Sequence, residues 1–132
     1  MHENETVGLI QQIYQAFGRG DIAAVLALID PQGDLTFEGP KSIPWAGHWQ
    51  GREGWAKFFQ TLGESAEEIA LQMEPFAAQG DHVVMIGRYQ ARVKRTGARI
   101  DTPLAHLWTL RNGLVVKCQE LTNTAAEAAA CE

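Results

Sequence analysis

Three side chains that can hold or move a proton stand where a folded chain could bring them together: Tyr14, His106 and Glu120. His106 and Glu120 lie in two alternating segments on either side of the turn dipeptide Asn112-Gly113, which is typical of a β-hairpin. Alternation sets both residues among apolar neighbours on one face of the hairpin. Polar groups embedded in an apolar wall favour acid–base chemistry, and Tyr14 on an opposing helix would complete the group.

The register of this hairpin is open between two alternatives. A two-residue turn would pair Leu104 with Leu121, whereas a three-residue loop with a bulge would pair Leu104 with Glu120 and His106 with Cys118. We prefer the second register because it keeps the lysine of the last strand off the core face. It collects on one face Leu104, His106, Trp108, Leu110, Leu114, Val116, Cys118 and Glu120.

The apolar pattern changes from helical to alternating between the two halves of the chain. Apolar residues three and four positions apart predict helices over 7–17, 22–29 and 51–63, with a short strand at 34–39 after the second. The second half alternates and is cut by turn dipeptides, which predicts antiparallel strands near 67–79, 82–95, 98–111 and 114–123. The alanine-rich tail is expected to be a short helix or a frayed end.

Helices followed by a long meander indicate one α+β domain over residues 1–132. Strands of ten or more residues twist and coil, so we expect a strongly curved, mixed or antiparallel sheet wrapped around the N-terminal helices as a cone. A cone of this size tends to contain a pocket.

Composition and charge exclude several functional classes. The net charge is −5, from 11 basic and 16 acidic residues, so nucleic acid is not an expected partner. The four clustered cations Arg92, Lys94, Arg95 and Arg99 flank a predicted turn and are interpreted as a solvated hairpin. We expect no signal peptide or membrane span, and the two cysteines favour a cytoplasmic location without a disulfide framework. No metal-binding spacing or phosphate-cradling motif is present, so no metal and no cofactor are expected.

The stretch "IPWAGHWQGREGW" at 43–55 holds three of the four tryptophans and one of the four histidines. Its proline and glycines predict an irregular loop across the mouth of the cone, which gives way to a helix after Gly51. Trp45, His48 and Trp49 are therefore candidates for the rim of the pocket, and Trp55 for the core.

Three segments resemble a known family: "YQAFGRGD", the "WAG…GREGWAKFF" stretch and "DTPLAHLWTLRNGLVVKCQELTNTA". Together they resemble the SnoaL-like polyketide cyclase and ketosteroid-isomerase-related branch of the nuclear transport factor 2-like superfamily, from about residue 5 to 126. The resemblance implies an acid/base on the final strand, where Glu120 stands, and a nearby histidine, where His106 stands. It also implies an oxyanion donor at Tyr14. Gly39 occupies the position of the aspartate that serves steroid isomerases as general base, and Asn123 that of a strand-end aspartate.

The residues and the resemblance together predict an enzyme that acts on a small, apolar, carbonyl-bearing molecule by isomerisation, aldol cyclisation or dehydration. Its ligand is expected to contact Phe37, Trp45, His48, Trp49, Tyr89, Trp108 and Cys118. The alternative is a non-catalytic module that binds a small apolar ligand. Either would form a homodimer through the outer sheet face, for which the candidates are Ala105, Leu107, Val115 and Leu121.

Overall fold

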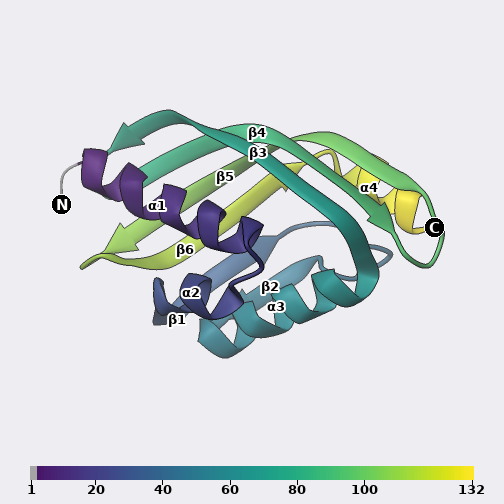
Figure 1. The fold of residues 1–132 in the computed structure, drawn as a ribbon, viewed down its shortest axis with the longest axis horizontal. Helices are drawn as coiled ribbons and strands as arrows, with labels where there is room; N and C mark the ends of the chain where they lie inside the picture. Colours follow the sequence, from purple (N-terminus) through teal and green to yellow (C-terminus); the bar gives the residue numbers. More distant parts are fainter. Residues whose placement is uncertain (1–2) are drawn as a thin grey trace.

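The computed structural model describes residues 3–132, which form four helices and six strands. In chain order these are α1 (Glu3–Gly18), α2 (Ile22–Ala27), β1 (Ile29–Phe37), β2 (Gly47–Gln50), α3 (Gly51–Ser65), β3 (Ala66–Gln79), β4 (His82–Val93), β5 (Arg99–Arg111), β6 (Leu114–Thr122) and α4 (Thr124–Cys131). The strands make one sheet in the order β2-β1-β6-β5-β4-β3, in which only β1 and β6 run parallel. The predicted α+β fold with a curved, mixed sheet around N-terminal helices is confirmed (Figure 1).

The helices are held against the concave face of the sheet by apolar stripes and by capping. Helix α1 buries Ile10, Ile13 and Ala16, and the carboxylate of Asp21 caps α2 by accepting a hydrogen bond from the Ala24 amide. Burial of such a stripe removes apolar surface from water, which is the main force that holds each helix on the sheet.

Two side chains of α3 tie the start of that helix to β1. The Arg52 Nε donates to the carbonyl of Ile29 at 2.7 Å, and the Trp55 Nε1 donates to the carbonyl of Gly33 at 3.2 Å. Gly33 is required there, because a Cβ would lie 2.6 Å from the carbonyl oxygen of Val115. These contacts fix the aromatic face of α3 over the sheet.

The curvature of the sheet arises where β3 presses against β4. Strand β3 has two register shifts, and Glu68 adopts a positive φ of 54° within the first of them. A Cβ on Gly87 would lie 1.8 Å from the carbonyl oxygen of Gln72, so only glycine allows this approach. Bulges and a glycine at the point of closest contact bend the edge strands over the helices.

Strand β2 lies within the stretch expected to be a loop. It pairs with β1 in antiparallel fashion, with Thr36 opposite His48 and Leu35 opposite Trp49. The free edge of β1 supplies backbone hydrogen-bond partners, so four residues become a strand despite the glycines around them. Strand β1 also starts at Ile29, earlier than predicted, and the second helix ends before it.

The predicted register of the β5–β6 hairpin is wrong. Its turn has two residues, Asn112 and Gly113, both with positive φ, and the extra residue is a bulge at Val116. His106 therefore pairs directly with Glu120.

The bulge also changes which residues face the core. Beyond it, Cys118 and Glu120 keep the predicted face, because the true register differs from the predicted one by two residues. Before the bulge, Val115 is 1% exposed and belongs to the core, so its assignment to the outer face is also wrong.

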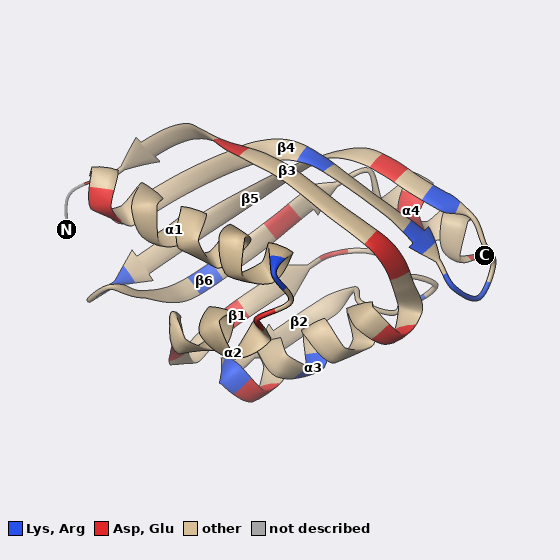
Figure 2. Cartoon of the chain, viewed as in Figure 1, with Lys and Arg blue, Asp and Glu red and all other residues tan. Residues whose placement is uncertain are grey.

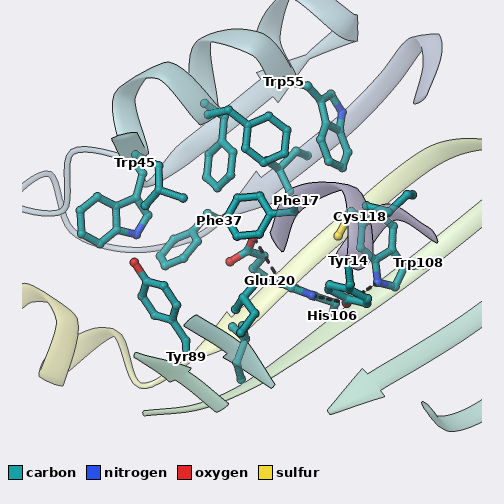
Figure 3. A pocket seen from close by; sticks show the side chains of 17 residues that line it. Tyr14, Phe17, Phe37, Trp45, Trp55, Tyr89, His106, Trp108, Cys118 and Glu120 are labelled. Atoms are coloured by element: carbon teal, nitrogen blue, oxygen red, sulfur yellow. Dashed lines mark hydrogen bonds and ion pairs between the residues drawn. The ribbon is translucent and has the colours of Figure 1, made fainter. Parts of the chain in front are cut away.

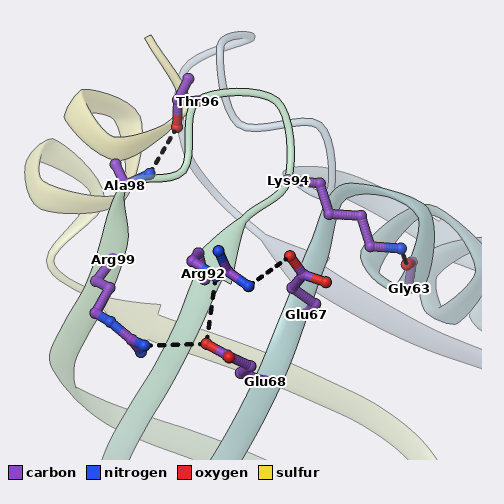
Figure 4. Close-up of polar contacts among 8 residues, drawn as sticks. All are labelled: Gly63, Glu67, Glu68, Arg92, Lys94, Thr96, Ala98 and Arg99. Atoms are coloured by element: carbon purple, nitrogen blue, oxygen red, sulfur yellow. Dashed lines mark hydrogen bonds and ion pairs between the residues drawn. The ribbon is translucent and has the colours of Figure 1, made fainter.

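The clustered cations at the β4–β5 turn are engaged rather than simply solvated (Figure 4). Arg92 contacts Glu67 at 3.0 Å and Glu68 at 3.3 Å, and Arg99 contacts Glu68 at 3.1 Å. Charges of both signs alternate over this end of the molecule (Figure 2).

The same turn also holds two helix ends. Lys94 donates to the carbonyl of Gly63 in α3, and Arg95 and Thr96 donate to the carbonyls of Cys131 and Ala130 in α4. These bonds satisfy carbonyls that a helix end leaves unpaired, so the turn anchors the C-terminal ends of α3 and α4.

The outer face of the sheet carries exposed apolar side chains. Leu121, opposite Ala105, is 54% exposed on this face. Phe76, in the second register shift of β3, is also exposed. A homodimer through this face stays a prediction, now without Val115. Among residues 3–132, no helix has the length and apolar character needed to cross a membrane.

Candidate active site

A cavity lies between the concave face of the sheet and the helices α1 and α3 (Figure 3). Its volume is about 60 Å³, enough for several water molecules. Its walls are Ile13, Tyr14 and Phe17 from α1; Trp55, Phe58, Phe59 and Leu62 from α3; Leu35, Phe37, Leu71, Tyr89, Leu104, His106, Trp108, Cys118 and Glu120 from the sheet; and Trp45. The cavity is therefore mostly apolar and aromatic, with a few polar groups.

Three of those polar groups form a hydrogen-bonded chain. The Trp108 Nε1 donates to the Tyr14 hydroxyl at 3.0 Å, and that hydroxyl lies 2.5 Å from the His106 Nδ1. The rings support this contact, since Tyr14 stacks on His106 and meets Trp108 edge-on.

We assign the protons of this chain from its donors. The Trp108 N–H occupies one lone pair of the Tyr14 oxygen, and we assign the Tyr14 proton to the hydrogen bond with the His106 Nδ1, whose role as acceptor depends on the tautomer. Burial raises the pKa of Tyr14 well above its usual range, with smaller contributions from Cys118 and Glu120, so the phenol keeps its proton. In this assignment the ring proton of His106 is on Nε2, which faces Glu120.

Glu120 is the acid at the open end of this chain. It pairs with His106 across β5 and with Phe37 across the parallel β1, so two neighbouring strands fix its position. Its Oε1 lies 3.3 Å from the His106 Nε2, a close polar contact without the alignment of a hydrogen bond. The Glu120 side chain is 14% exposed and that of His106 only 5%. The carboxylate thus reaches the cavity while its partner lies in the wall.

The end of the cavity toward α4 carries a second polar group. The Trp45 Nε1 donates to the Glu127 Oε1 at 3.3 Å, and Glu127 is 0% exposed with no hydrogen-bond partner for its Oε2 among the described residues. Burial raises the pKa of Glu127 to about 7, with Thr122 and Trp45 opposing the rise and Glu120 adding to it. Tyr89 is also buried there, and its hydroxyl has no partner among residues 3–132.

The comparisons with known proteins place the chain in a family. A model of the SnoaL-like domain matches residues 10–118. The chain belongs to the SnoaL-like family. This confirms the resemblance read from the sequence. No curated protein sequence matches the chain.

Several solved structures share the fold of this SnoaL-like chain. An NTF2-like protein from Burkholderia xenovorans LB400 is 29% identical, with a TM-score of 0.90, over 100% of this chain and 99% of its own. A protein named as a SnoaL-like polyketide cyclase from Jannaschia sp. CCS1 is 20% identical, with a TM-score of 0.84, over 98% of this chain and 92% of its own. TerC, co-crystallised with polyporic acid, is 21% identical, with a TM-score of 0.86, over 96% of this chain and 98% of its own.

The structure brings together most of the residues that the sequence nominated in this SnoaL-like chain. Tyr14, His106 and Glu120 meet in one cluster. The predicted ligand contacts Phe37, Trp45, Tyr89, Trp108 and Cys118 all line the cavity.

His48 and Trp49 lie outside the cavity, contrary to prediction. His48 is on the outer side of β2, where its Nε2 lies 3.7 Å from the Asp34 carboxylate. Trp49 packs against Phe58, and its Nε1 donates to the carbonyl of Trp45. The pairing of β2 with β1 places His48 on the outer face of the sheet, whereas Trp49 lies opposite the inward-facing Leu35 and packs behind the cavity wall. Trp45 is a buried wall residue instead of a rim residue.

Sequence reasoning assigned Trp55 of α3 to the core and left Glu127 unassigned. Trp55, Phe58 and Phe59 in fact form one wall of the cavity. Their helical spacing indicated an inward face but not the hollow beneath it. For Glu127, the available signal was a single acid within a run of alanines, after the capping residue Asn123.

A surface hollow shares lining residues with the cavity. It lies between the C-terminal ends of α1 and α3 and strand β3. Both spaces are bordered by Tyr14, Phe17, Phe59, Leu62 and Leu71. A ligand entering here would pass the two helix ends rather than the 43–49 segment. Within residues 3–132, no group of three or more histidines, cysteines or acids is arranged to hold a metal.

Substitution of Tyr14 by phenylalanine is expected to destabilise the protein by about 1–3 kcal/mol. The change leaves the buried Trp108 N–H without its acceptor and the His106 Nδ1 without its donor. Urea unfolding of the two proteins measures the difference. An unchanged midpoint would show that the Trp108–Tyr14–His106 chain does not form in solution.

Proposed function

We propose that this SnoaL-like protein is a cofactor-independent enzyme that moves a proton next to the carbonyl group of a small apolar molecule. The observation that carries the proposal is the Trp108–Tyr14–His106 chain, which ends at the Glu120 carboxylate in an apolar cavity. A base held by a hydrogen-bonded histidine, away from bulk water, has the placement that removal of a proton from carbon requires.

In this reaction the Glu120 carboxylate takes a proton from the carbon next to the carbonyl. The electrons of the broken C–H bond form a carbon–carbon double bond, and the carbonyl π electrons move to the oxygen as an enolate. Where the ketone carries a neighbouring carbon–carbon double bond, the enolate is a dienolate, and the protonated Glu120 returns the proton to the far carbon of that double bond, which completes an isomerisation. The same enolate could instead attack a second carbonyl in an aldol cyclisation, in which the protonated Glu120 gives its proton to the new alkoxide. It could also expel a β-hydroxyl group, which leaves as water with the proton from Glu120.

His106 and Tyr14 act in this scheme as positioning residues. The His106 Nε2 proton faces Glu120 and holds the carboxylate toward the cavity, and the Tyr14 proton fixes the orientation and tautomer of the imidazole. His106 is only 4% exposed, so this arrangement is kept by packing as well as by hydrogen bonds.

The lining of the cavity supports an apolar, flat ligand. Tryptophan, phenylalanine and tyrosine rings contribute from both helices and from the sheet, and aromatic faces bind planar molecules by stacking. Two structural neighbours agree with this class, one through its name as a polyketide cyclase and one through the polyporic acid with which it was co-crystallised.

Deuterium exchange tests the proposal without knowledge of the natural substrate. The protein is incubated in D₂O with a panel of small apolar ketones that includes 1-tetralone, and deuterium incorporation next to the carbonyl is followed by NMR. We expect exchange above the buffer rate for at least one ketone. Ligand binding without any exchange across the panel would favour the alternative, a non-catalytic binding module.

A further inference from the structure

Tyr89 carries a hydroxyl group that no described residue uses. The side chain comes from the middle of β4, is 6% exposed and lines the cavity, and its Oη has no hydrogen-bond partner among residues 3–132. Figure 3 shows its oxygen directed toward Trp45, on the side of Glu120 opposite to His106. A phenylalanine would fill the same space without a desolvated hydroxyl, so the oxygen adds nothing to packing.

The other strong donors around the cavity are already engaged. The indole N–H of Trp45 donates to Glu127, that of Trp55 to Gly33, and that of Trp108 to Tyr14. The Tyr14 hydroxyl is the expected oxyanion donor, but its proton is directed at the His106 Nδ1. The Nε2 proton of His106 has no hydrogen-bond partner among the described residues, but it faces the Glu120 Oε1 at 3.3 Å. Apart from this proton and the weakly donating thiol of Cys118, Tyr89 is the free donor in the lining.

The surroundings keep Tyr89 in its donating form. Burial raises its pKa well above the usual range, and the carboxyl groups of Glu127 and Glu120 raise it further. The phenol therefore stays protonated at neutral pH and offers an O–H rather than a negative charge.

We propose that the Tyr89 hydroxyl binds the ligand by donating a hydrogen bond to its carbonyl oxygen. That this oxygen belongs to a ketone rests on the proposed function. The oxygen of the ligand would then lie on the Trp45 side of Glu120, and the carbon next to the carbonyl would be presented to the carboxylate between Tyr89 and His106 (Figure 3). Tyr89 would thus replace Tyr14 as the group that stabilises the enolate oxygen.

Two probes that differ by one oxygen test this assignment. Calorimetry gives the dissociation constants of 1-tetralone, which has a carbonyl, and of tetralin, which has the same ring skeleton without it. The wild-type protein is expected to bind 1-tetralone about 5- to 10-fold more tightly than tetralin binds, as one net hydrogen bond allows. Tyr89→Phe is expected to weaken the binding of 1-tetralone alone. The ratio of the tetralin to the 1-tetralone dissociation constant should therefore fall close to one.

Tyr14→Phe is the matched control, because it removes the only other tyrosine hydroxyl of the chain. Its ratio is expected to stay above one, since the Tyr14 proton is directed at His106. A ratio that persists in Tyr89→Phe, or that is lost only in Tyr14→Phe, overturns the proposal.

A second measurement does not depend on the probes. Tyr89→Phe removes a buried hydroxyl without a partner in the protein, so the variant is expected to melt at the same temperature as the wild type or higher. A clearly lower melting temperature would show that the hydroxyl serves the fold, and would overturn a ligand-binding role.

The outcomes for Tyr89 and for the proposed reaction can be told apart. A ratio that depends on Tyr89 without deuterium exchange would keep the binding role and reject the enzyme. Deuterium exchange together with a ratio of dissociation constants that is unchanged in Tyr89→Phe would keep the enzyme and reject the binding role of Tyr89. Failure of both probes to bind the wild-type protein overturns this proposal together with the assignment of small ketones to the cavity.

Discussion

Glu120→Gln is expected to slow deuterium exchange on a responsive ketone by about 10²–10⁴-fold, the usual contribution of a general base. Glutamine has the same shape and still reaches the cavity, but its amide cannot accept the proton from carbon. The glutamine can keep the contact that Glu120 makes with the His106 Nε2 at 3.3 Å, because its amide oxygen is also an acceptor. The loss is therefore expected in the rate of exchange, with little change in ketone binding.

Two further variants sharpen this test. Glu120→Asp keeps the charge but withdraws the carboxylate by one methylene, and an intermediate loss of about 10²-fold is expected from misplacement alone. His48→Gln changes an exposed histidine that pairs with Asp34 outside the cavity, and is expected to leave the rate unchanged. A Glu120→Gln protein that exchanges at the wild-type rate would reject Glu120 as the base.

His106→Ala distinguishes a cluster from a single base. Because His106 positions Glu120, the single variant should also lose exchange, and the double variant Glu120→Gln/His106→Ala should lose little more than Glu120→Gln alone. Independent, multiplying losses would show that the two residues act separately. Circular dichroism on each variant verifies that the fold is kept.

Periodicity was sufficient to predict the helices and the long strands, because their patterns reflect which side is buried. The stripe of α1 and the aromatic face of α3 appear at helical spacing, and the meander from β3 to β6 is marked by its turns. Strand β2 escaped prediction because its stability comes from the edge of β1 and not from its own residues. A bulge is likewise a property of a strand pair, which is why Val116 could not be recognised as the extra residue.

The catalytic candidates could be found from sequence because alternate residues of a strand point to the same face, so a register error of an even number of residues leaves the face unchanged. A register error of two residues left His106 and Glu120 on the correct face, although it paired each with the wrong neighbour. The free hydroxyl of Tyr89 and the buried acid Glu127 could not be found this way. Whether a polar atom has a partner depends on distances between elements, and here it depends on how α4 and Trp45 close one end of the cone.

The buried Glu127 carboxyl at the α4 end of the cavity should make the free energy of unfolding fall as the pH rises from about 4.5 to 7. The Glu127 carboxyl is fully buried, and its pKa is raised to about 7 from an ordinary value of 4.5. In this range the folded protein holds a proton that the unfolded chain has released, so the free energy of unfolding decreases with pH and levels off above 7. The contribution of Glu127 to this fall is about 3 kcal/mol over the whole range.

Glu127→Gln is expected to remove this contribution. The amide oxygen can still accept from the Trp45 Nε1, while no charge has to be buried. The variant should match the wild type within about 1 kcal/mol at pH 5 and exceed its free energy of unfolding by roughly 2–3 kcal/mol at pH 8. Urea unfolding at several pH values between these limits measures both proteins.

The difference between the two curves, rather than either curve alone, isolates Glu127, because other groups titrate in both proteins. Glu132→Gln removes an exposed acid from the end of the same helix and should leave the slope of the wild type unchanged. Parallel curves for the wild type and Glu127→Gln would mean that the carboxyl reaches water in solution. In that case α4 would not seal the cone over Trp45, and the environment inferred for the nearby Tyr89 hydroxyl would be wetter than the structure indicates.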